Sequence, residues 1–82
     1  MFFKRRRAAD DVKPGSIYHR IYAPNVVEIA QVTWVGKGPA GQPHVRFQTS
    51  YKRPDNEEPQ GDRLLALDTF AERYQPLLAA HA

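Results

Sequence analysis

The chain has 82 residues, of which 41% are hydrophobic, 26% are charged and none is cysteine. A chain of this length forms one domain around one small core, which excludes a multidomain enzyme. The composition is typical of a globular domain rather than of a disordered segment. Without cysteine there are no disulfide bridges, no thiolate metal ligands and no cysteine nucleophile.

The positive charge of the chain is concentrated near its N-terminus. Twelve basic and nine acidic residues give a formal net charge of +3. Four of the cations are Lys4, Arg5, Arg6 and Arg7. Residues 8–82 therefore carry eight basic and nine acidic side chains, a balance of −1. Because a folded nucleic-acid-binding domain usually carries its positive charge on its surface, this distribution favours a protein partner over nucleic acid.

We predict that residues 1–12 form a basic, disordered tail, since unpacked chain ends fray. The run M-F-F-K-R-R-R is not followed by the apolar segment of about 7 to 15 residues that a secretory signal requires. The tail leaves two alternatives open: a weak contact with an anionic membrane surface, and an arm that contacts nucleic-acid phosphates. No apolar run elsewhere approaches the ~20 residues of a membrane span, so we expect no transmembrane segment and a cytoplasmic location.

The first predicted strand follows a turn at 13–15 and occupies residues 16–22, S-I-Y-H-R-I-Y. Side chains alternate between the two faces of a strand. One face carries Ile17, His19 and Ile21, and the other carries Tyr18, Arg20 and Tyr22. The two isoleucines predict that the first of these faces is inward, with His19 packed in the core. A turn at 23–25 then ends the strand.

The second and third predicted strands form a long hairpin. Residues 26–35 carry apolar side chains on both faces, which predicts a strand that bends, with a bulge, as small barrels require. Residues 36–43 are the hairpin loop, since their glycines and lysine lack the spacing of a phosphate-binding motif. In the third strand, 44–51, the alternation predicts that Val45 and Phe47 face inward while His44 and Arg46 face solvent.

The last third of the chain is predicted to hold a loop, a strand and a helix. Residues 52–61 are charged and contain two prolines and a glycine, which indicates a mobile surface loop. A short strand follows at 62–67. Asp68 or Thr69 is expected to cap the helix, since Thr69 and Glu72 have capping-box spacing. Phe70 and Tyr74 then share one helix face and close the core, and residues 76–82 form a frayed tail.

These elements predict a mostly β domain over residues 13–75, a small SH3-like half-open barrel of four to five antiparallel strands with a short C-terminal helix. The segments Q-P-H-V-R-F at 42–47 and R-L-L-A-L-D-T-F-A-E-R-Y at 63–74 resemble a group of small uncharacterised bacterial proteins with an SH3-like barrel. The resemblance covers roughly residues 15–74. It implies the fold, and it brings no known activity or binding residues with it.

Catalytic chemistry finds little support in this sequence. None of the three histidines lies in an H-x-H or H-x-x-x-H pair that would bind metal. Adjacent carboxylates occur only at 10–11 and 57–58, in segments expected to be mobile, where they hold no fixed geometry. We therefore expect no enzyme, no catalytic residues, no metal site and no cofactor.

Two binding functions remain, and the sequence favours the first. One is a non-catalytic protein-interaction module, with Tyr18, Tyr22 and Trp34 lining an aromatic surface. In this hypothesis Trp34 is as well suited to the core as to the surface. The alternative is single-stranded nucleic-acid binding, with Arg20 between the two tyrosines as a stacking platform and the basic tail assisting. The predicted binding residues are Tyr18, Arg20, Tyr22, Trp34, His44 and Arg46.

Overall fold

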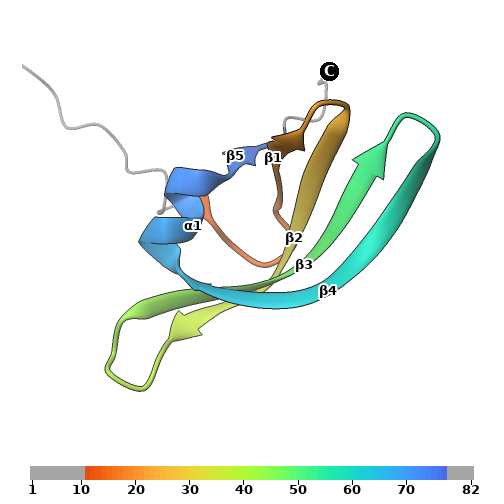
Figure 1. Cartoon of the computed structure of the whole chain (residues 1–82). Coiled ribbons are helices and arrows are strands. Elements are labelled where there is room, and N and C mark those ends of the chain that lie inside the picture. The colour runs from red at the N-terminus through yellow and green to blue at the C-terminus, as the bar shows by residue number, and fades with distance from the viewer. Residues whose placement is uncertain (1–10, 78–82) are drawn as a thin grey trace, which may run out of the picture.

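The computed structural model describes residues 11–77, in which five strands form one antiparallel sheet and one short helix follows the fourth strand (Figure 1). The strands are β1 (Ile17–Ala23), β2 (Val26–Lys37), β3 (Pro43–Arg53), β4 (Asn56–Ala66) and β5 (Gln75–Pro76), and the helix is α1 (Leu67–Arg73). Their order across the sheet is β4-β3-β2-β1-β5. The sheet curls so that α1 lies in its hollow, which confirms the predicted half-open barrel with a short C-terminal helix.

The core lies between the inner face of the sheet and α1. Aromatic rings form its centre, because Phe70 of α1 lies 4.8 Å from Phe47 and 5.0 Å from Tyr18 between ring centroids. Tyr74 stacks on Phe70 at 4.8 Å, which confirms that these two residues close the core. The buried hydrophobic residues are Val12, Tyr18, Ala30, Val32, Val45, Phe47, Phe70 and Tyr74. Val12, placed in the tail by sequence, is thus part of the packed domain.

The prediction for the two faces of β1 was wrong. Tyr18 is 4% exposed and points inward, whereas Ile17 and Ile21 are 42% and 71% exposed on the outer face. The physical reason is the aromatic core, since the ring of Tyr18 fills the space beside Phe70 at a T-shaped angle of 68°. His19 also lies on the outer face, where its Nδ1 is 3.1 Å from the carbonyl oxygen of Gln75.

The predicted long hairpin of β2 and β3 is confirmed, and so is its bulge. The pairing register shifts between Val32 and Trp34. This irregularity lets Val32 point into the core while Trp34, two residues later, points out of it. The predicted turn before β2 is also present, with Asn25 at φ 65°.

The prediction of a mobile loop at 52–61 was wrong. From Asn56 the chain forms β4, a strand of 11 residues that pairs with β3 along its length. Because β4 is an edge strand and mostly exposed, its side chains show no alternation from which the strand can be recognised. Its register shifts between Thr49 and Ser50 of β3, opposite Pro59 and Gly61. The proline thus lies at a bulge, a position that strands tolerate.

The C-terminal segment differs from its prediction at both ends. Helix α1 begins at Leu67 with Ala66 as its N-cap and no side-chain capping bond, so the predicted caps at Asp68 or Thr69 were wrong. After the helix, β5 pairs with Tyr18 and His19 of β1. The amide of Leu77 donates to the carbonyl of Ile17 at 2.9 Å. The predicted C-terminal tail therefore starts as ordered chain, and residues 78–82 lie outside the described part, as do the basic residues 4–7.

Among the described residues, no helix has the length and apolar character needed to cross a membrane.

Candidate binding surface on the outer face of the sheet

Three of the predicted binding residues meet on the outer face, near the hairpin that joins β2 and β3. In the pairing register Trp34 of β2 lies opposite Arg46 of β3, and Arg46 lies opposite Leu64 of β4. His44 is two residues before Arg46 on the same face of β3. We call this set the outer cluster: Trp34, His44, Arg46 and Leu64. It runs across three neighbouring strands, so rigid backbone positions all four side chains.

The indole of Trp34 lies over Gly36, two residues further along β2. A Cβ atom added to Gly36 would come within 2.2 Å of Cζ2 and 2.6 Å of Cη2 of the indole. Only glycine therefore leaves room for this ring position. Trp34 remains 42% exposed, which settles the alternative left open by the sequence, since the residue is not a central core side chain.

The two basic residues of the outer cluster differ in their contacts. His44 Nδ1 lies 2.9 Å from the carbonyl oxygen of Gln42 in the hairpin loop, which fixes the imidazole. Arg46 contributes only its carbonyl, which accepts a bond from Thr33 Oγ1 at 3.2 Å. Within residues 11–77, no ion pair or hydrogen bond involves the guanidinium of Arg46. This cation is therefore available to a partner beside Trp34 and Leu64.

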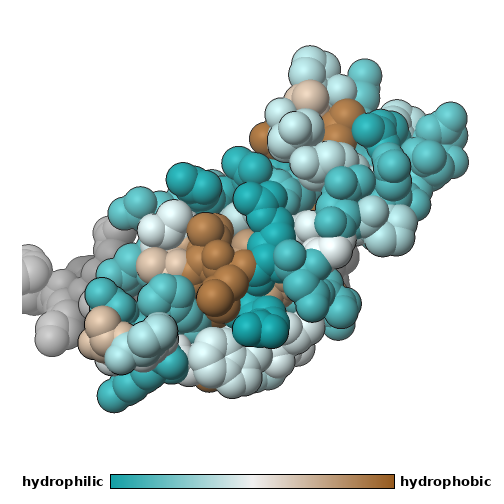
Figure 2. All heavy atoms as spheres, turned by 60° about the horizontal axis from the view of Figure 1, so that its bottom comes forward, coloured by the Kyte–Doolittle hydropathy of each residue, from teal (hydrophilic) through white to brown (hydrophobic). Residues whose placement is uncertain are grey.

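Several large apolar side chains are exposed in the described part of the protein. They include Trp34 and Leu64, the latter 52% exposed. Figure 2 shows one face of the molecule, on which hydrophobic side chains form separate groups bordered by hydrophilic ones. Contiguous exposed apolar groups with a polar border are typical of surfaces that bind other molecules.

The predicted platform of Tyr18, Arg20 and Tyr22 does not form on the surface. Tyr18 belongs to the core, and its burial, with a smaller effect of Asp11, raises the pKa of its hydroxyl. Tyr22 is exposed and stacks on Tyr51 with ring centroids 4.5 Å apart. Both tyrosines of β1 face the inner side, away from the outer cluster, so the six predicted residues divide between two faces of the sheet.

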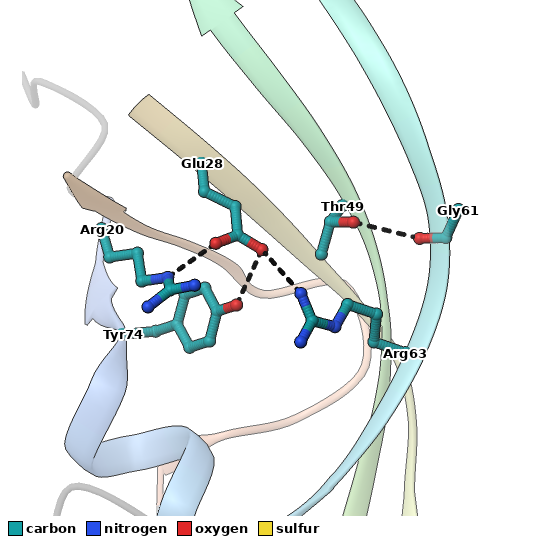
Figure 3. Close-up of polar contacts among 6 residues, drawn as sticks. All are labelled: Arg20, Glu28, Thr49, Gly61, Arg63 and Tyr74. Atoms are coloured by element: carbon teal, nitrogen blue, oxygen red, sulfur yellow. Dashed lines mark hydrogen bonds and ion pairs between the residues drawn. The ribbon is translucent and has the colours of Figure 1, made fainter. Parts of the chain in front are cut away.

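Arg20 belongs to a polar network inside the barrel, centred on Glu28 (Figure 3). Glu28 has no exposed surface. Its Oε1 accepts a bond of 2.6 Å from Nε of Arg20, and its Oε2 accepts one of 2.8 Å from the hydroxyl of Tyr74. Nη1 of Arg63 lies 3.6 Å from the same Oε2. Both carboxylate oxygens are thus occupied, and the network ties β1, β2 and β4 to the residue that follows α1.

Aromatic rings also support Arg20. Its guanidinium carbon lies 5.3 Å from the ring centroid of Tyr74 and 5.9 Å from that of Tyr22, within cation–π range. The hydrogen bond to Glu28 raises the pKa of Arg20. Burial, followed by the bond to Glu28, raises the pKa of Tyr74 to about 12. Arg20 therefore stays charged and the hydroxyl of Tyr74 stays protonated at neutral pH.

Sequence reasoning missed Leu64, Glu28 and Arg63. Leu64 was placed in a short strand, but its position beside Arg46 depends on the register of an edge strand. Glu28 stands in a strand between apolar neighbours, and this pattern is one signal of an inward-facing carboxylate. Arg63 carries no signal of its own, because its partner is 35 residues away in the chain.

Within residues 11–77, no group of three histidine, aspartate or glutamate side chains comes together in a way that would hold a metal ion. Comparison of the chain with protein-family models, with curated proteins and with solved structures finds no match.

Proposed function

We propose that this protein is a non-catalytic protein-interaction module that binds its partner through the outer cluster. One observation carries the proposal: a half-exposed tryptophan lies over Gly36 beside an arginine whose guanidinium has no partner within the described residues. Tryptophan and arginine are the side chains most enriched among residues that dominate binding energy in protein interfaces. A ring already held in place loses little conformational entropy on binding.

A protein partner is favoured over nucleic acid by the arrangement of charge and aromatic rings. The aromatic residues suited to stacking on bases, Tyr22 and Trp34, lie on opposite faces of the sheet, so a single strand would not follow both. Residues 8–82 have a balance of −1, whereas affinity for nucleic acid depends mainly on phosphate neutralisation. Apolar Leu64 beside Trp34 also fits a protein surface better than a phosphate backbone.

The proposal is tested by selecting partners from a library of random 12-residue peptides displayed on phage, with the full chain immobilised. We expect the selected peptides to lose at least about 10-fold in affinity with Trp34→Ala and with Arg46→Ala, as for interface residues of this type. The matched control is Tyr22→Ala, which removes an exposed aromatic side chain from the other face and should leave peptide affinity unchanged.

Either of two results would overturn the proposal. Selected peptides that bind Trp34→Ala as tightly as the wild type would place the binding surface elsewhere. Failure to select any peptide, combined with saturable amide shifts at residues 34 and 44–46 on titration with mixed-sequence single-stranded DNA, would assign the outer cluster to nucleic acid.

A further inference from the structure

A groove lies on the outer face next to the outer cluster, at the bulge between β3 and β4. Its volume is about 330 Å³. It is lined by Ile29, Gln31, Gln48, Thr49, Ser50, Glu57, Pro59, Gly61 and Asp62. The register shift opposite Ser50 leaves one residue of β4, Gln60, without a partner in β3, so the ladder is interrupted there. Bulges of this kind occur often beside functional sites, where they redirect side chains.

The lining of the groove combines an apolar floor with acceptors for hydrogen bonds. Ile29 and Pro59 supply apolar surface, while Gln31 and Gln48 supply amide groups. Glu57 is held in position by Ser50, whose Oγ donates to Oε2 of Glu57 at 2.7 Å. A ligand in the groove would therefore meet both a packing surface and oriented polar groups.

The charge of the groove is negative. Glu57 and Asp62 line it, and no lysine or arginine does. Lys52 lies opposite Glu57 in the register but does not line the groove. Asp62 forms no ion pair within residues 11–77. The groove thus presents two carboxylates to whatever enters it.

We propose that this groove takes an arginine side chain of the same protein partner that the outer cluster binds. Asp62 pairs in register with Gln48, two residues from Arg46 on the same face of β3. At about 3.3 Å per residue, the groove and the outer cluster lie roughly 7 Å apart along the strand, close enough for one extended segment to reach both. A planar guanidinium matches carboxylate and amide acceptors and packs its faces on apolar surface, which a lysine ammonium does not.

This inference rests on the proposed function, since it names the chemistry of the partner, but its test does not require the partner. The probe is N-acetyl-arginine amide, titrated into the isotope-labelled full chain while backbone amide shifts are followed. We expect saturable shifts at residues 29–31, 48–50 and 57–62. The uncharged analogue N-acetyl-citrulline amide should bind at least 10-fold more weakly, and N-acetyl-lysine amide should also bind more weakly.

The double variant Glu57→Gln with Asp62→Asn should abolish the shifts while leaving the rest of the spectrum unchanged. Asp55→Asn is the matched control, because Asp55 lies in the turn before β4 and does not line the groove. Shifts that citrulline reproduces, or that persist in the double variant, would overturn the inference, as would the absence of shifts at these residues. Lysine binding equal to arginine binding would overturn the guanidinium assignment. None of these outcomes changes the test of Trp34.

Discussion

Glu28 is the residue on which the interior of the barrel depends, because a charged carboxylate without solvent contact needs a partner for each oxygen. Arg20 of β1, Arg63 of β4 and Tyr74, which follows α1, provide these partners. The desolvation penalty of a buried ion pair offsets much of its attraction, so the network contributes more to a single defined arrangement of strands than to stability. Removing a partner of Glu28 is costly because the carboxylate has no exposed surface, whereas the side chains of Arg20 and Arg63 remain 31% and 44% exposed.

We expect Glu28→Ala to lower the free energy of unfolding by about 1 to 3 kcal/mol, since it leaves the buried hydroxyl of Tyr74 without its acceptor. Glu28→Gln keeps an acceptor for Tyr74 and should cost less. The measurement is urea denaturation of both variants beside the wild type. Equal stability of Glu28→Ala and the wild type would show that the carboxylate is solvated in solution.

Because of Tyr74, the folded state should become less stable as the pH rises into the alkaline range. Its folded pKa is raised to about 12, above the ordinary value of 10.0. A group of this kind contributes stability that is fully present below pH 10 and is lost as the pH rises toward the folded pKa. The loss for Tyr74 should be up to about 2 kcal/mol between pH 9 and pH 12.

The Tyr74→Phe variant should therefore be less stable than the wild type at pH 8, and the difference should shrink above pH 10. Chemical denaturation at pH 8, 9, 10 and 11 measures this. A constant difference across the series would contradict the assignment of the alkaline loss to this hydroxyl.

Gly36 controls the position of Trp34, which is the only tryptophan in the chain and so reports directly by fluorescence. In Gly36→Ala the new methyl group would occupy space that the indole now fills. We expect a red-shifted emission and faster quenching by acrylamide, with weaker binding of peptides selected on the wild type. Gly15→Ala is the control, because a Cβ atom added there would meet nothing within 4 Å; its φ of 92° should make this variant less stable but leave the emission unchanged. Wild-type emission from Gly36→Ala would mean that the ring lies elsewhere in solution.

Strand β4 forms the side of the sheet that carries the groove, and its bulge is built around Gly61. This residue has φ 101°, a conformation that residues with a side chain rarely adopt. Nothing lies within 4 Å of an added Cβ, so the cost of substitution is conformational rather than steric. Gly61→Ala should therefore destabilise the protein by about 1 to 2 kcal/mol.

The same substitution should alter the groove, because relief of the strain would change the bulge. Thermal denaturation and amide shifts at residues 57–62 measure the two effects. A variant with wild-type stability and an unchanged spectrum would indicate that the bulge does not require a positive φ at Gly61.

Strand β4 lies at an edge of the sheet and carries features that oppose pairing with other chains. Charged side chains, a proline and a bulge occupy its first half, and each of these devices protects an exposed edge. The segment 62–66 has fewer of these protective features, and it contains Leu64 of the outer cluster. The unprotected part of the edge and the proposed binding surface are thus adjacent.

At the level of the whole molecule, the order β4-β3-β2-β1-β5 places the first and last described strands side by side. Tyr74 and β5 complete both the core and the sheet. A chain that ends at residue 73 should lose the cooperative unfolding transition seen for the full chain, because it lacks a core aromatic residue and the partner of β1. Circular dichroism during heating tests this. A sharp transition in the shortened chain would show that closure by β5 is dispensable.

Sequence predicted the parts of the fold that depend on local pattern. The hairpin of β2 and β3, the bulge in β2 and the closure of the core by Phe70 and Tyr74 were predicted from local pattern, although Tyr74 follows α1 in extended conformation instead of sharing a helix face with Phe70. The inward face of β1 was not, because two isoleucines indicated the core while the actual choice depended on a ring contact between Tyr18 and Phe70, far apart in the chain.

The candidate surface was predicted only in part, because alternation within a strand can be read from the sequence while the register between strands cannot. Alternation in β3 placed His44 and Arg46 toward solvent, and Trp34 was a candidate for either the core or the surface. The pairing register places Trp34 beside Arg46 and adds Leu64. Register across strands and the position of a long edge strand are properties of the assembled sheet. Local composition carries little information about either.

The pairing of β1 with β5 also has a consequence during translation. The ribosome releases β1 early, yet Leu77, whose amide bonds to Ile17, is made 60 residues after that partner. Until residues 67–77 emerge, Val32, Val45 and Phe47 have no helix to cover them, and the nascent sheet presents an uncovered apolar face. Fast synthesis of residues 67–77, or transient shielding by a chaperone, would therefore shorten the time for which this face is open to aggregation.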